Sequence, residues 1–267
     1  MSESIENANS VSNSDKKTKK FNKKSLFIVL NYFITPIFIM LICIKILDNQ
    51  KIMESVMSLN FVIKFFENNA YLIENRELFD KFFVDILGSI ATLIAFIIAI
   101  FIVKKRTDSI SKNKTTVSFK KLFLIGIGLG VFMILWNIII SYTYPLFGLT
   151  FKSNNTESIL KSLKLNKILL INLLISAPIG EEIAFKYGVF TFFHEIFQDK
   201  GKLLKILLPA LVSAFVFAVI HDGLYLVPLY IVPSFIGCLI YEKTRSLLPC
   251  ILGHFLNNLL AIITLLS

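Results

Sequence analysis

Polar side chains that can do chemistry lie inside three apolar segments of the carboxy-terminal half of this sequence. Each segment carries a pair at helical spacing: a glutamate four residues before a lysine, a phenylalanine before a histidine, and a histidine before an asparagine. They are Glu181, Glu182 and Lys186, then Phe217 and His221, and last His254 and Asn258. Because a charged group at the centre of a membrane-spanning helix costs about 2.5–3.5 kcal/mol on insertion scales, each is a functional candidate.

The two adjacent acids are predicted to have different roles. Glu182 and Lys186 stand at i and i+4, where opposite charges meet on one helix face, so the lysine can neutralise this glutamate and fix its rotamer. Glu181 projects about 100° further round the helix and is free to face a different cavity. Pro178, three residues earlier, weakens the helical hydrogen bonding at this point.

Together these residue types suit hydrolysis. A buried carboxylate such as Glu181 can take a proton from water, and an imidazole can hold that water or a metal ion. A second imidazole with an amide, here His254 and Asn258, can stabilise an oxyanion. Taken singly, a histidine is as well explained by a hydrogen bond between packed helices, and a Glu–Lys pair by a structural ion bridge. Their occurrence together on three segments favours a shared functional site.

The elements that position these residues are predicted to be helices in a lipid bilayer. Hydrophobic residues make up 55% of the 267 residues, and the mean hydropathy is +0.71, which is too apolar for a soluble domain of this length. The run 86–103 has no charged residue and approaches the ~20 residues that cross a bilayer. Since lipid offers backbone groups no water, such runs must form helices.

The hydrophobic segments predict an all-α, polytopic transmembrane bundle of about seven spans. The mixed-charge stretch 48–81 is expected to lie outside the membrane core, although an eighth span there is an alternative. The expected spans are roughly 26–47, 84–103, 122–144, 167–193, 204–221, 224–241 and 247–266.

Three regions follow from this pattern. Residues 1–24 are polar, basic and low in complexity and are expected to be a disordered cytoplasmic tail. Residues 25–165 hold amino-terminal transmembrane helices and loops, and 166–267 form the catalytic helical core. The net charge of +10 lies in the tail and in short loops, which places the amino terminus in the cytoplasm of a plasma-membrane protein and argues against a nucleic-acid partner.

The three motifs resemble those of the CAAX protease and bacteriocin-processing (CPBP, Abi) family of intramembrane endopeptidases, over about residues 165–262. At Lys186 the family motif normally has arginine. The resemblance implies a helical bundle with a cavity open within the membrane. It further implies that Glu181 and His221 activate water while His254 and Asn258 hold the oxyanion, with Glu182 in support.

Two questions stay open at this level. Zinc or another divalent metal bound by Glu181, His221 and His254 is one possibility, and a metal-free mechanism with Glu181 as general base is the other. The expected function is endopeptidase cleavage of a peptide or membrane-protein substrate. The alternative is a non-catalytic membrane scaffold of the same fold that acts on a sensor kinase or an envelope protein. The sequence makes no prediction of oligomeric state.

Overall fold

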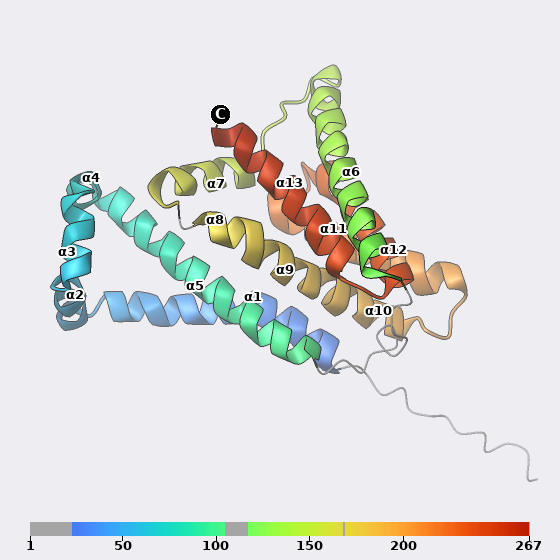
Figure 1. Cartoon of the computed structure of the whole chain (residues 1–267), viewed down its shortest axis with the longest axis horizontal. Helices are drawn as coiled ribbons and strands as arrows, with labels where there is room; N and C mark the ends of the chain where they lie inside the picture. The colour runs from blue at the N-terminus through green and yellow to red at the C-terminus, as the bar shows by residue number, and fades with distance from the viewer. Residues whose placement is uncertain (1–22, 105–116, 168, 267) are drawn as a thin grey trace, which may run out of the picture.

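The computed structural model describes residues 23–104, 117–167 and 169–266, and its regular elements in these ranges are all helices (Figure 1). The all-α fold predicted from the hydrophobic segments is therefore confirmed. Most of the predicted tail, 1–24, lies outside the described residues, so the expectation of disorder there stays a prediction.

Two long amino-terminal helices, α1 (Lys23–Leu47) and α5 (Arg76–Lys104), run in opposite directions and cross each other (Figure 1). The Asn31 side chain on α1 is hydrogen-bonded to α5, since its Nδ2 donates to Ala95 O at 2.9 Å. Thr35 Oγ1 in turn donates to Asn31 Oδ1 at 2.9 Å. In lipid, where apolar helix surfaces gain little from leaving the solvent, such polar contacts and close packing hold helices together.

The stretch between these helices folds into three short helices, α2 (Gln50–Met57), α3 (Asn60–Glu67) and α4 (Ala70–Glu74). At about 1.5 Å per residue none of them can cross the bilayer, so the structure gives no support to an eighth span here. Helix α5 begins before the predicted residue 84, at Arg76, and its first turns carry ion pairs at i and i+4, such as Arg76 with Asp80.

Helices α6 (Phe119–Leu146) and α13 (Leu248–Leu266) pack closely against each other. A Cβ added at Gly130 would lie 3.0 Å from Leu256 Cβ, and one at Gly253 would lie 2.9 Å from Leu129 Cγ. Glycine is required at these crossings because any side chain would force the two helices apart.

One continuous helical segment, 169–196, runs between α5 and α13 (Figure 1). Helices α7 (Asn154–Leu165), α11 (Lys202–Asp222) and α12 (Val227–Thr244) complete the described bundle. The segment 169–196 consists of α8 (Leu169–Ile171), η1 (Asn172–Ser176), α9 (Ala177–Glu182), η2 (Ile183–Phe190) and α10 (Thr191–Ile196).

Five of the described helices are long and apolar enough to cross a membrane: α1, α5, α6, α11 and α13. Their number and composition make this a multi-pass membrane protein. The segment 169–196 and α12 occupy the positions of the two other expected spans, and the total of seven stays a prediction.

Candidate active site

The helix that carries both acids is wound more loosely than an α-helix on either side of them. Segments η1 and η2 are π-helical, a geometry that is rare and concentrates at functional sites. Ala177 N–H donates to Asn172 O, five residues back. Proline accounts for part of this, because Pro178 has no N–H and its ring clashes with the carbonyl four residues earlier. The sequence predicted a weakened helix at Pro178, but not π-helical turns on both sides.

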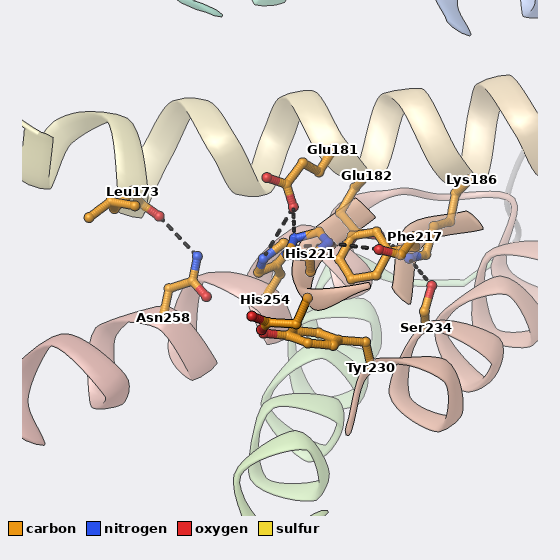
Figure 2. A network of polar contacts seen from close by, with 11 residues as sticks. Leu173, Glu181, Glu182, Lys186, Phe217, His221, Tyr230, Ser234, His254 and Asn258 are labelled. Carbon is orange, nitrogen blue, oxygen red and sulfur yellow. Dashed lines mark hydrogen bonds and ion pairs between the residues drawn. The ribbon is translucent and has the colours of Figure 1, made fainter. Parts of the chain in front are cut away.

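Asn258 is hydrogen-bonded to a backbone carbonyl group that this local winding leaves without an N–H donor. In an α-helix Leu173 O would accept from Ala177 N–H, which here donates to Asn172 O instead. In a π-helix it would accept from residue 178, which is proline and has no N–H. Asn258 Nδ2 donates to Leu173 O at 3.0 Å and fills this gap (Figure 2). The structure therefore holds Asn258 against the backbone of η1, and one of its two amide hydrogens is in use.

The Glu181 carboxylate faces the imidazoles of two other helices (Figure 2). Its Oε2 atom lies 3.4 Å from His221 Nε2 on α11 and 3.7 Å from His254 Nε2 on α13. The carboxylate is 14% exposed. These separations are longer than hydrogen bonds, as catalytic contacts often are before substrate binds. The structure thus brings together the three residues that the separate motifs predicted.

The orientation of His221 is set by a hydrogen bond at one ring nitrogen and by contacts with two aromatic rings. Its Nδ1 lies 2.7 Å from Phe217 O, and since a carbonyl only accepts, we assign the proton to Nδ1. Nε2 then has a free lone pair toward Glu181. The ring lies 4.2 Å from the ring of Phe217 and 4.9 Å from that of Tyr230, and Tyr230 O–H donates to Asp222 Oδ2 at 2.6 Å.

Tyr230 and Asp222 were not predicted from the sequence. Asp222 follows His221 directly and accepts from Ser153 Oγ at 2.7 Å, which ties the start of α7 to the end of α11. An acid beside a motif histidine was a signal for Asp222. Nothing in the local pattern pointed to Tyr230, because its contact with His221 depends on how α12 packs.

Glu182 turns away from Glu181 and contacts Lys186 of its own motif and His254 of another. Its Oε2 lies 2.9 Å from Lys186 Nζ, which is the i, i+4 ion pair that the spacing predicted, and its Oε1 lies 3.1 Å from His254 Nδ1. Lys186 Nζ also donates to Ser234 Oγ at 3.3 Å and sits 5.2 Å above the Phe217 ring. Glu182 and Lys186 are 3% and 2% exposed, so the pair is buried.

The charges of the site balance if one imidazole is protonated. Two buried carboxylates require two positive charges, because an unpaired buried charge is costly. Lys186 supplies one of them beside Glu182. His254 is placed to supply the other, since its two nitrogens face Glu182 and Glu181, at 3.1 Å and 3.7 Å. The arrangement can therefore accept a proton at Glu181 and donate hydrogen bonds from His254.

A metal site was one of the two open possibilities for Glu181, His221 and His254. These side chains are of the types that bind zinc, and each ring has a carbonyl or carboxylate partner at Nδ1, as metal ligands commonly do. In the part of the chain that the structure describes, however, no group of three or more His, Cys, Asp or Glu is arranged to hold a metal ion. The metal stays a prediction.

Comparison with known proteins gives the same family as the motifs. Residues 164–260 match the family model described as type II CAAX prenyl endopeptidase Rce1-like. The chain is also similar to "Putative membrane peptidase YdiL" of Bacillus subtilis (strain 168), with 26% identity over 180 residues, which are 67% of this chain and 69% of that protein. No solved structure matches the chain significantly. Over residues 164–260 this multi-pass membrane protein is therefore similar to the Rce1-like family of membrane peptidases, the resemblance that the three motifs predicted.

Proposed function

We propose that this protein is an intramembrane endopeptidase that hydrolyses a peptide bond of a peptide or membrane-protein substrate with water activated by Glu181 and His221. The observation that carries the proposal is the position of Glu181 Oε2 between the Nε2 atoms of His221 and His254, at 3.4 Å and 3.7 Å. A buried carboxylate flanked by two oriented imidazoles provides a proton acceptor and a hydrogen-bond donor around one space.

The reaction begins with a water molecule held by two acceptors, the Glu181 carboxylate and the free Nε2 lone pair of His221. Glu181 takes a proton from this water as its oxygen bonds to the scissile carbonyl carbon. The developing oxyanion accepts a hydrogen bond from protonated His254, which Glu182 holds through Nδ1. When the carbon–nitrogen bond breaks, the proton on Glu181 moves to the leaving amine, and the carboxylate is restored.

Asn258 is proposed as a second donor to the oxyanion. One of its amide hydrogens is donated to Leu173 O, which leaves the other for substrate. The proposal also includes insertion in the plasma membrane with a cytoplasmic amino terminus. It is supported by the lysines concentrated before α1, because basic residues beside spans favour the cytoplasmic side.

The test compares membrane peptides from cells that express the wild type with those from cells that express Glu181→Gln. The amide keeps the shape of the carboxylate but cannot accept the proton, so we expect cleavage products to disappear while the protein still inserts. Glu74→Gln is the matched control, since Glu74 is exposed on α4, and it should leave the peptide set unchanged. Cleavage by purified Glu181→Gln at the wild-type rate would exclude Glu181 as the base.

A further inference from the structure

A cavity of about 240 Å³ lies between α1, α5 and the segment 169–196, and Glu181 forms part of its wall. The three elements leave this space because small residues face it, among them Ala95 on α5 and Gly180 beside the glutamate. The wall of the cavity thus combines the proposed catalytic carboxylate with residues of α1 and α5, which carry none of the three motifs.

Two of the polar side chains in the cavity wall are already hydrogen-bonded to the backbone. Asn31 bonds to the α5 backbone at Ala95 O, and Thr92 Oγ1 donates to Gly88 O within its own helix, at 2.9 Å and 2.8 Å. Two hydroxyl groups differ from these. Those of Tyr32 on α1 and Ser176 at the end of η1 line the cavity, yet neither has a hydrogen-bond partner among the described residues.

Tyr32 is held in place by its ring rather than by its hydroxyl. The ring makes edge contacts with Phe33 and Phe185, with centroids 5.2 Å and 5.6 Å apart. Polar groups inside a protein or a bilayer nearly always have hydrogen-bond partners, because an unpaired one loses the water that it would otherwise bind. Two such hydroxyls in the cavity wall beside Glu181 are therefore available to bind a polar group that enters the cavity.

We propose that this cavity receives one apolar side chain of the substrate next to the scissile bond, and that Tyr32 and Ser176 hydrogen-bond the substrate backbone there. This rests on the proposed endopeptidase function. An extended peptide inside the membrane exposes backbone N–H and C=O groups that need partners, which the two hydroxyls supply. A cavity of about 150 Å³ accepts benzene, so one of about 240 Å³ has room for a leucine or phenylalanine side chain.

The test uses the full chain in lipid nanodiscs and a synthetic peptide library in which each position is randomised in turn, with cleavage sites read by mass spectrometry. For the wild type we expect one position beside the cleaved bond to require an apolar residue. Gly180→Ala and Ala95→Leu, which narrow the cavity from two helices, should each shift the preference at that position from phenylalanine toward alanine by about tenfold or more. Preferences elsewhere should stay as in the wild type.

Gly88→Ala is the matched control for Gly180→Ala. A Cβ at Gly180 would meet only Phe96 Cβ, at 4.0 Å, and a Cβ at Gly88 would meet nothing within 4 Å, so both variants are expected to fold. Gly88 lies outside the cavity wall, and its variant should keep the wild-type profile.

A second pair of variants tests the hydroxyl. Tyr32→Phe keeps the ring contacts and removes one hydrogen bond to substrate backbone, so kcat/KM should fall about 3- to 10-fold whichever apolar side chain is present. Tyr142→Phe, at an exposed tyrosine on α6, should have no effect.

The outcomes separate the two proposals. If the wild type cuts no library peptide, as is expected of Glu181→Gln, both the endopeptidase function and the pocket are overturned. A wild type that cuts peptides without an apolar requirement, or with a requirement that neither Gly180→Ala nor Ala95→Leu alters, overturns the pocket alone. Unchanged kcat/KM for Tyr32→Phe overturns the backbone contact.

Discussion

The imidazole of His254 is held by Glu182, with Nδ1 3.1 Å from Oε1, although the two residues are 72 positions apart in the chain. The other oxygen of the same carboxylate lies 2.9 Å from Lys186 Nζ. The second acid of the Glu-Glu pair thus orients a catalytic candidate from another helix, and only Glu181 faces the cavity. Adjacent acids on one helix therefore divide into a proposed base and a support.

Replacing Lys186 by alanine is expected to destabilise the fold. The variant leaves Glu182 without its cation at a site where both side chains are 5% exposed or less, and breaking such a buried pair costs about 3–5 kcal/mol. The measurement is the free energy of unfolding in detergent. Lys152→Ala serves as the control, because the ion pair of Lys152 with Glu157 is largely exposed.

Lys186→Arg tests the same contact conservatively. The variant keeps the charge and introduces the arginine that the similar motif normally has. Because arginine can donate two hydrogen bonds to one carboxylate, the variant should keep or raise activity. Wild-type stability of Lys186→Ala would show that the ion pair with Glu182 contributes nothing.

Gly237→Ala is expected to lower activity and stability through Lys186. A Cβ at this position would lie 3.1 Å from Lys186 Cε and 3.5 Å from Nζ, so it would push the ammonium group away from Glu182. Overpacking of this kind costs about 1–3 kcal/mol. Peptide cleavage and thermal unfolding measure the effect. Gly128→Ala on α6 is the control, since a Cβ there meets nothing within 4 Å; equal behaviour of both variants would contradict the prediction.

Asn258→Ala separates catalysis from anchoring. Removal of an oxyanion donor lowers kcat by about 10²–10³-fold, which is the expected result if the second amide hydrogen reaches the substrate. The control is Asn257→Ala, which removes the neighbouring amide that accepts at 2.9 Å from Asn137 on α6. Asn257→Ala should lose stability but keep kcat. If Asn258→Ala also keeps kcat, Asn258 serves only to hold Leu173 O.

The orientation of the chain can be read from a reporter fused after Ser267. With a cytoplasmic amino terminus and an odd number of spans, the carboxy terminus lies on the outer face. A fused alkaline phosphatase should therefore be active, and a fluorescent protein that folds only in the cytoplasm should stay dark. Bright fluorescence would contradict either the seven spans or the cytoplasmic amino terminus.

The sequence by itself determined the class of the protein and the contacts within single helices. Long apolar runs can only be helices in lipid, so the membrane bundle followed from composition. The pairing of Glu182 with Lys186 followed from helical periodicity, because residues four apart share one face whatever surrounds them. The motifs also predicted the similarity to Rce1-like peptidases, since they specify residue types at fixed spacings.

Only the tertiary structure decided the contacts between helices. The bond from His254 to Glu182, the ring contact of Tyr230 with His221 and the cavity that Tyr32 shares with Glu181 join distant parts of the chain. These contacts depend on where helices cross and how closely small residues let them approach, which no single segment specifies. The hydrogen bond of Asn258 to Leu173 O depends on both the sequence and the tertiary structure. Proline removes a local donor, and the packing of α13 supplies another.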